Sequence, residues 1–147
     1  MYKFKPMTLD FANEIVKWKY TGFMKSIYMK PYFDNYNEDT SEMKGPGNCD
    51  GFVAVEGNDI VGLFEYYHHD DCMEIGLALS PDYIGKGLSK NFILDGMMFG
   101  VKKFDYKKDF IKLCVELGNV AAYKAYLKVG FVEKDRNSEE IEMIYYL

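Results

Sequence analysis

The sequence of 147 residues predicts one mixed α/β domain that spans residues 1–147. Three observations support this class. Short runs that alternate large with small or polar residues, as strands do, are interspersed with segments of helical periodicity. No repeat, linker or low-complexity segment divides the chain. The length and the hydrophobic fraction of 48% are enough for one sizeable core.

The N-terminal third is predicted to hold a strand, a helix and an aromatic segment. Residues 2–7 form the strand, and Thr8 caps a helix with Leu9, Ala12, Ile15 and Val16 on one face. The aromatic segment contains Pro31, and its pattern does not decide whether it is helical. The polar, turn-rich residues 34–51 that follow are predicted to form a mobile loop. Most rings of the aromatic segment are expected in the core, and several of its tyrosines are expected to line a ligand cleft. These rings are Trp18, Tyr20, Phe23, Tyr28, Tyr32, Phe33 and Tyr36.

The middle of the chain reads as three consecutive strands. Residues 52–56 and 60–67 flank turn residues and form an antiparallel hairpin. In the third strand, residues 72–80, the odd positions are large and the even positions are small or polar. One face therefore suits the core, and the other lets a ligand approach the backbone closely.

The C-terminal half is predicted to add two helices and three strands. A long helix covers residues 87–104, and the four-residue spacing of Gly96 and Gly100 places both glycines where it could lie close to the sheet. A strand over residues 111–117 leads to a helix from Asn119 to Gly130. Residues 131–134 and 141–147 form the closing strands, so the element order is β-α-(α)-β-β-β-α-β-α-β-β.

Composition argues against several classes of protein. No run of about 18 apolar residues occurs, and the charged N-terminus lacks an apolar signal core, so we expect a cytoplasmic protein without a membrane partner. The net charge of −5 argues against a nucleic-acid partner and is compatible with a cationic acceptor. The cysteines are odd in number and widely spaced, so we expect neither a disulfide scaffold nor a bound metal. They are Cys49, Cys72 and Cys114.

A glycine-rich turn, Ile84-Gly-Lys-Gly-Leu-Ser89, lies between a strand and a helix. The first turn of a helix has free N–H groups and partial positive charge, and glycines let an anion reach them. A pyrophosphate suits such a site. By itself the turn is equally compatible with a glycine turn that only starts a helix. The third glycine of a dinucleotide fingerprint and the spacing of a P-loop are both absent.

The segment from Asn119 to Phe131 carries a second signal. Asn119 can cap the helix, Gly130 can end it, and Ala122 and Tyr126 share one face. Without its surroundings, Tyr126 reads as a half-buried ring that anchors the helix. The whole segment, however, resembles the signature N-x-x-A-x-x-x-Y-x-x-x-G-F of the GNAT N-acetyltransferases, with all five positions in register.

The glycine-rich turn is similar to the acetyl-CoA loop of the same family, Q/R-x-x-G-x-G/A. Gly87 matches its first glycine, whereas Ile84 stands where Gln or Arg is usual and Ser89 where Gly or Ala is usual. The hairpin of residues 52–67 also looks like the second and third strands of the family. The resemblance implies a GNAT-like central mixed sheet, mostly antiparallel, of six to seven strands flanked by about four helices.

The resemblance further implies a set of coenzyme contacts. The loop amides would hold the pyrophosphate of acetyl-CoA, with lower affinity because Ile84 cannot donate. The strand that ends at Ser80 would pair with the pantetheine arm, and Tyr126 would protonate the departing thiolate as the catalytic acid. A phenol, with a pKa near 10, stays protonated at neutral pH. The implied coenzyme-binding residues are Leu77, Ala78, Leu79, Ile84, Gly85, Lys86, Gly87, Leu88, Ser89, Asn119, Ala122 and Tyr126.

An ammonium acceptor must lose a proton before it attacks a thioester. Glu74, on the small-residue face of its strand, is the leading candidate base, although an exposed strand carboxylate is an equally good interpretation. Glu116 and Glu65 are further candidates. The His68-His69 pair reads as a solvated turn, and Cys114 as a buried thiol rather than a nucleophile.

We therefore expect an acetyl-CoA-dependent N-acetyltransferase that acts on a primary amine by direct attack in a ternary complex, without a metal. The acidic loop residues Asp34, Glu38, Asp39 and Glu42 could steer a cationic acceptor. A peptide N-terminus, a lysine, a polyamine, an aminoglycoside and an amino acid all remain open, and a homodimer is compatible with the sequence. The rivals are a non-catalytic acyl-CoA-binding module on the same fold and a plain interaction domain.

Overall fold

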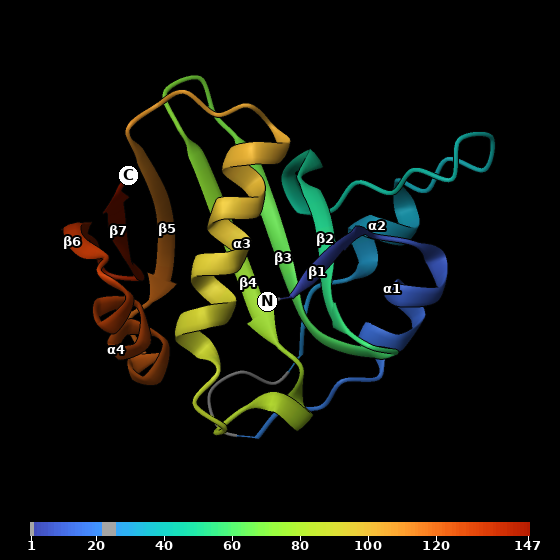
Figure 1. The fold of residues 1–147 in the computed structure, drawn as a ribbon, viewed down its shortest axis with the longest axis horizontal. Coiled ribbons are helices and arrows are strands. Elements are labelled where there is room, and N and C mark those ends of the chain that lie inside the picture. Colours follow the sequence, from blue (N-terminus) through green and yellow to red (C-terminus); the bar gives the residue numbers. More distant parts are fainter. Residues whose placement is uncertain (1, 22–25) are drawn as a thin grey trace.

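The computed structural model describes residues 2–21 and 26–147 and contains one seven-stranded sheet with the order β1-β2-β3-β4-β5-β7-β6 (Figure 1). All neighbouring strands are antiparallel except β4 and β5, which run parallel. This confirms the predicted mixed and mostly antiparallel sheet. The strands are β1 (Lys3–Pro6), β2 (Asp50–Glu56), β3 (Asp59–His68), β4 (Met73–Leu79), β5 (Phe110–Glu116), β6 (Val132–Arg136) and β7 (Glu140–Tyr146).

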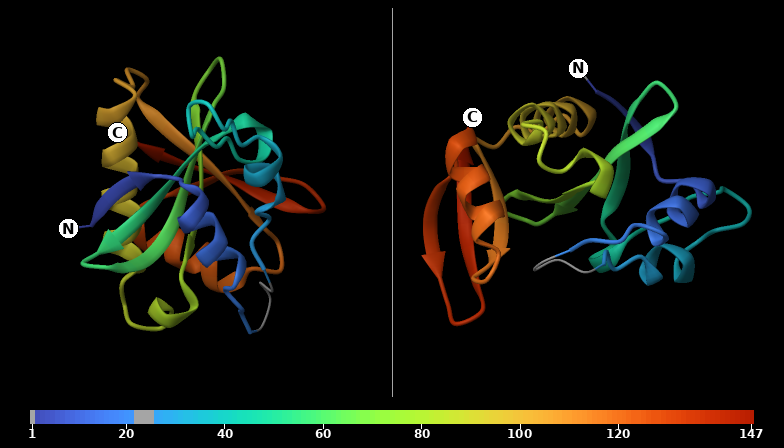
Figure 2. Two further views of the ribbon diagram at one scale, coloured as in Figure 1. Left: turned by 90° about the vertical axis from the view of Figure 1, so that its right-hand side faces the viewer. Right: turned by 90° about the horizontal axis from the view of Figure 1, so that it is seen from below.

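Four α-helices flank the sheet in the described part of the chain. The helices α3 and α4 pack on one face of the sheet, and α1 and α2 pack on the other (Figure 2). Short 3-10 turns at Pro46–Asn48 and Pro81–Tyr83 precede β2 and α3. The α-helices are α1 (Leu9–Val16), α2 (Lys30–Asp34), α3 (Ser89–Lys103) and α4 (Val120–Val129).

The long helix α3 lies close to the sheet because two glycines face it. A Cβ atom at Gly96 would come within 2.5 Å of Phe64 Cζ, and one at Gly100 within 2.8 Å of Tyr66 Cδ1. The Tyr66 hydroxyl donates a 2.6 Å hydrogen bond to the carbonyl of Gly96. The predicted close approach at both glycines is confirmed.

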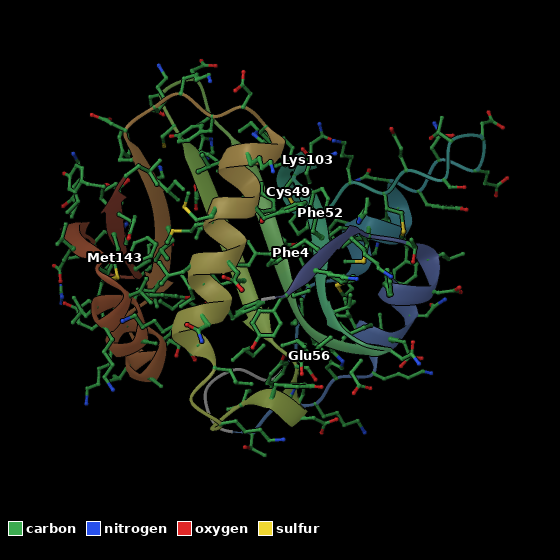
Figure 3. All side chains as sticks on the ribbon, in the orientation of Figure 1. Phe4, Cys49, Phe52, Glu56, Lys103 and Met143 are labelled. Atoms are coloured by element: carbon green, nitrogen blue, oxygen red, sulfur yellow. The ribbon has the colours of Figure 1, made fainter. Side chains whose placement is uncertain are left out.

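Aromatic side chains fill the layer between α3 and the sheet. The ring of Phe99 on α3 stacks on Phe4 at 4.9 Å and meets the edge of Phe52 at 5.1 Å between centroids. Figure 3 labels Phe4 and Phe52 in this layer. Such pairs add favourable quadrupole contacts to the burial of apolar area, so this layer anchors β1 and β2 to the helix.

The aromatic segment supplies a second core, on the α1 and α2 face. Tyr32 is fully buried there with Ala12, Ile15 and Val53, while Tyr28 is 66% exposed. Trp18, Phe33 and Tyr36 pack against this core. The expectation that most of these rings lie in the core therefore holds for this group, and Phe23 lies outside the described residues.

Helix α3 begins at Ser89 rather than at Gly87. Gly87 has a φ of 72°, and a residue in the left-handed region cannot be part of a right-handed helix. The remaining element bounds differ from the predicted ones by three residues or fewer at each end. No helix within the described ranges is both long and apolar enough to cross a bilayer.

Candidate active site

The parallel strands β4 and β5 pair over two residues and then separate. Their register joins Met73 to Ile111 and Glu74 to Lys112. Beyond Glu74, β4 stays paired with β3 as far as Leu79, and β5 stays paired with β7. The carboxyl ends of β4 and β5 therefore move apart toward the end of the sheet where α3 begins (Figure 1). An edge without a strand partner presents backbone N–H and C=O groups to a ligand.

A cavity of about 320 Å³ lies where the two strands diverge. Its walls come from β4, the loop before α3, the start of α3, and α4. The structure thus brings together the strand, the loop and the helix that the sequence analysis selected for coenzyme binding. The predicted coenzyme residues that line the cavity are Leu77, Ala78, Leu79, Ile84, Gly85, Ser89, Asn119, Ala122 and Tyr126.

Three other predicted coenzyme residues do not line this cavity. Lys86 lines a separate groove of about 580 Å³, and its Nζ lies 5.5 Å from the centroid of the Tyr83 ring. Gly87 and Leu88 connect the loop to α3. For these two residues the prediction depends on their backbone amides and not on their side chains.

The loop before α3 has the backbone geometry of an anion site. Gly85 and Gly87 have φ values of 77° and 72°, a region in which residues with a Cβ are strained. Leu88 follows in the right-handed region, and its side chain does not cap α3. Successive residues of opposite hand form a concave nest of N–H groups, and the uncapped first turn of α3 adds more donors. This combination suits a phosphate.

Helix α4 begins and ends as its sequence predicts. The side-chain oxygen of Asn119 accepts a 3.2 Å hydrogen bond from the Ala122 amide, so Asn119 is the N-cap. Gly130, at φ 123°, ends the helix, and its amide donates to the carbonyl of Tyr126 at 3.2 Å. The caps fix which face of α4 turns toward the cavity, and Ala122 and Tyr126 lie on that face.

Tyr126 combines both sequence-based interpretations. Its ring packs on Phe131, with centroids 5.8 Å apart, so it anchors α4 to the core. It also lines the cavity. Burial raises the pKa of Tyr126 to about 12, so its hydroxyl remains protonated at neutral pH and is available as a hydrogen-bond donor.

Glu74 lies outside the cavity, at the last position where β4 pairs with β5. Its Oε1 is 2.8 Å from His69 Nε2 and 3.9 Å from Lys112 Nζ. It lines a different groove, of about 300 Å³, with Cys114 and Glu142. The structure therefore places Glu74 beside the point where the strands diverge but already engaged by His69 and by the ammonium group of Lys112. Its role as a base stays a prediction.

The structure also shows the surroundings of the other polar residues considered in the sequence. His68, like His69, is paired with a carboxylate, since its Nε2 lies 2.9 Å from Asp50 Oδ2. Burial raises the pKa of Cys114 to about 12, so the thiol is protonated and a poor nucleophile. Glu116 is exposed at the end of β5. Within the described residues, no group of three His, Cys, Asp or Glu side chains is placed to hold a metal ion.

Several cavity residues were not predicted. The hydroxyl of Tyr20, from the aromatic segment, donates a 2.5 Å hydrogen bond to the carbonyl of Leu79 at the end of β4. No local pattern could have shown a contact between residues this far apart. Helical spacing from Ala122 could have indicated Ala125, which shares its face. The unpredicted lining residues are Tyr20, Thr21, Phe92, Ile93, Ala121 and Ala125.

The sequence is similar to known acetyltransferases. The model of the acetyltransferase (GNAT) family matches residues 13–131. The chain is 28% identical, over 120 residues, to spermidine N(1)-acetyltransferase of Escherichia coli strain K12. That alignment covers 82% of this chain and 61% of the relative, so the chain spans about three fifths of the length of the curated relatives it matches.

Solved structures share the same fold. A chimera of the Vibrio cholerae spermidine N-acetyltransferase SpeG and hSSAT superposes with a TM-score of 0.76 at 17% identity, covering 99% of this chain and 95% of that chain. The V. cholerae enzyme in complex with CoA and spermine gives a TM-score of 0.69 at 16% identity and the same coverage. A dodecameric structure of that enzyme gives 0.71 at 19% identity, covering 99% of this chain and 93% of that one.

Proposed function

Because the chain belongs to the acetyltransferase (GNAT) family, we propose that it transfers an acetyl group from acetyl-CoA to a primary amine. The attack is direct and takes place in a ternary complex. The observation that carries the proposal is the cavity between the diverging ends of β4 and β5. It joins a nest of loop amides at one end to a partly buried phenol at Tyr126, which are the two features that a diphosphate with a thioester tail requires.

The loop and the strand edge are proposed to hold the coenzyme. The amides between Gly85 and Ser89 receive the pyrophosphate. The edge of β4 from Leu77 to Leu79, which β5 leaves unpaired, hydrogen-bonds the amide groups of the pantetheine arm, and the Leu79 carbonyl on this edge also accepts from Tyr20. The small side chains of Ala122 and Ala125 leave room for that arm beside α4. Ile84 supplies no side-chain donor, so backbone amides contribute most of the binding to phosphate.

Tyr126 is proposed to stabilise the leaving group. As the amine nitrogen attacks the carbonyl carbon, the new C–N bond forms, the C–S bond breaks and negative charge grows on the sulfur. A free thiol has a pKa of about 8.5, and the Tyr126 hydroxyl is protonated because burial raises its pKa to about 12. The hydroxyl therefore donates a hydrogen bond to the sulfur in the transition state.

A polyamine is the acceptor that the observations favour. The sequence relative from E. coli is named for spermidine, and a structural relative from V. cholerae is described with spermine. The groove of about 580 Å³ next to the loop is lined by four carboxylates and two aromatic rings besides Lys86 and Tyr83. A net charge of −5 and such a groove raise the local concentration of a polycation. The carboxylates belong to Asp10, Glu14, Asp59 and Asp82, and the rings to Phe11 and Trp18.

Thiol release from acetyl-CoA in the presence of a panel of amines tests the activity. We expect turnover with spermidine or spermine and little with amino acids. The alternative, a non-catalytic acyl-CoA-binding module, predicts calorimetric binding of acetyl-CoA without turnover of any amine. An absence of both binding and turnover would favour a plain interaction domain.

Replacing Gly87 by alanine should weaken acetyl-CoA binding about tenfold, since the left-handed φ costs a residue with a Cβ about 1–2 kcal/mol and the strain falls on the nest amides. Gly57→Ala is the matched control. Gly57 has a φ of 63°, close to the 72° of Gly87, and an added Cβ would meet nothing within 4 Å at either position. Both variants should therefore lose similar stability in a thermal melt. Calorimetry that finds equal coenzyme affinity in the two variants would contradict the proposed phosphate site.

The assembly state is a separate proposal. A structural relative from V. cholerae is described as dodecameric, and we propose that this chain also self-associates, as a dimer or a larger oligomer. Light scattering coupled to size-exclusion chromatography measures this directly. A monomer at micromolar concentration would contradict it.

A further inference from the structure

Glu65 occupies the middle of β3, on the face of the sheet that carries α1 and α2. Its chain neighbours Phe64 and Tyr66 point into the core under α3, and alternation along the strand turns Glu65 to the other side. The strand register places Gly51 of β2 beside it on one flank and Gly76 of β4 on the other. A carboxylate at the centre of a sheet thus has a glycine on each side.

The surroundings of the two glycines differ. At Gly51 the space is taken by Tyr32, because an added Cβ would lie 2.7 Å from the Tyr32 Cζ atom. At Gly76 an added Cβ would have only Glu65 and Tyr67 among its nearest atoms, at 3.3 Å from Glu65 Oε1 and 3.5 Å from Tyr67 Cε1. The position that a side chain would take at Gly76 is therefore bordered by a carboxylate oxygen and an aromatic ring, and we refer to it as the space above Gly76.

Two phenols hold the carboxylate in place. The Tyr32 hydroxyl donates to Oε2 of Glu65 at 2.6 Å, and the Tyr67 hydroxyl donates to Oε1 at 3.1 Å. Tyr32 also lies 3.9 Å from Cys49 Sγ; Figure 3 labels Cys49, just before β2. Each carboxylate oxygen can accept two hydrogen bonds, so Oε1 retains an acceptor site next to the space above Gly76.

Glu65 lacks a cationic partner among the described residues. Nearby carboxylates do have one, since Asp50 pairs with Lys44 and His68, and Glu74 with His69 and Lys112. A carboxylate removed from water is costly unless a cation compensates it. Its surroundings suggest that the missing cation is supplied by a ligand, and a neighbouring ring strengthens the attraction for an ammonium group.

The space above Gly76 lies close to the proposed coenzyme cleft. Gly76 lies two residues beyond Glu74, where the pairing of β4 with β5 ends, so the space is next to the narrow end of the proposed coenzyme cleft. We propose that Glu65, held by Tyr32 and Tyr67, binds the ammonium group of the acceptor above Gly76 and removes its proton. This inference rests on the proposed acetyl transfer and assigns the base to β3 rather than to Glu74.

The proton balance is simple. The ammonium gives one proton to the Glu65 carboxylate, and the neutral amine attacks the thioester carbon. The C–S bond breaks as the C–N bond forms, and the second proton lost by the nitrogen passes to the sulfur, which the Tyr126 hydroxyl hydrogen-bonds. A neutral thiol and a neutral amide result, and Glu65 returns its proton to water. Burial raises the pKa of Glu65, outweighing the opposing hydrogen bonds from Tyr32, Tyr67 and Cys49. A carboxyl group with a raised pKa is a stronger base.

The test compares Glu65→Gln with Glu74→Gln over a range from about pH 6 to about pH 9, using spermidine as acceptor. Glu65→Gln should lower kcat/KM roughly 100-fold at the acid end. The deficit should shrink as the pH rises, because water then supplies neutral amine without a base. Glu74→Gln tests the rival assignment: if Glu65 is the base, the pH dependence of kcat/KM in Glu74→Gln should match that of the parent. Calorimetry should show unchanged acetyl-CoA affinity in both variants.

A merely structural role for Glu65 predicts a loss that does not vary with pH, and this result would overturn the proposal. So would a pH-dependent loss confined to Glu74→Gln. An inactive parent protein would instead refute the acetyl transfer itself. Tyr67→Phe provides a second variant should Glu65→Gln fail to fold: without the donor that lowers the pKa of Glu65, the acid limb of kcat/KM should move to higher pH. An unmoved limb would contradict the assignment.

Discussion

Tyr126→Phe is expected to lower kcat by about 100-fold or more, the usual contribution of a positioned general acid, while acetyl-CoA still binds. The change removes one oxygen atom and leaves the ring on Phe131, so the anchor of α4 stays in place. The missing hydroxyl matters only in the transition state, when negative charge develops on the sulfur and no donor stabilises it. The effect should therefore appear in kcat, with little change in the KM for acetyl-CoA. Thiol release and calorimetry on the same samples measure both quantities.

Tyr123→Phe is the matched control for this experiment. Tyr123 lies on the same helix, but its hydroxyl donates to Glu133 Oε1 at 3.0 Å, near the surface, and it does not line the cavity. The control should retain its turnover within about twofold, because a surface hydrogen bond contributes little to the active site. Similar turnover in Tyr126→Phe and Tyr123→Phe would exclude the Tyr126 hydroxyl from the reaction.

Gly96→Leu is expected to destabilise the fold by about 3 kcal/mol, at the upper end of the cost of overpacking a core. Glycine is a poor helix former, and leucine in its place would gain about 1 kcal/mol if space allowed. Space is lacking, because even a Cβ atom at Gly96 would come within 2.5 Å of Phe64 Cζ. Either α3 moves away from the sheet, or Phe64 leaves its position and the hydrogen bond from Tyr66 to the Gly96 carbonyl weakens.

Thermal unfolding followed by circular dichroism measures the loss, and each kcal/mol should lower Tm by about 2–4 °C for a chain of this size. Met98→Leu serves as the control on the same helix, since Met98 is 53% exposed and this substitution should change stability by less than about 0.5 kcal/mol. A Tm that rises in Gly96→Leu would show that the helix propensity dominates and that α3 does not press on Phe64.

Local patterns predicted much of the fold. Asn119 and Gly130 cap α4 because a side-chain oxygen and a left-handed glycine act within one turn of the chain. The alternation along β4 and the glycines before α3 are likewise visible over a few residues. These patterns therefore predict most of the cavity lining. They place the start of α3 two residues early, since sequence does not show that Gly87 takes a positive φ.

What remained open depends on contacts between distant parts of the chain. From local sequence patterns we predict the GNAT-type order of strands and helices, the caps of α4 and Tyr126 as the candidate acid. Only the tertiary structure showed that Tyr20 reaches the end of β4, and that Glu65 lies between Gly51 and Gly76 with two phenols on its carboxylate. The reason is physical: propensities and caps act within a few residues, whereas strand register, desolvation and the pairing of charges are set by segments that meet only when the chain folds.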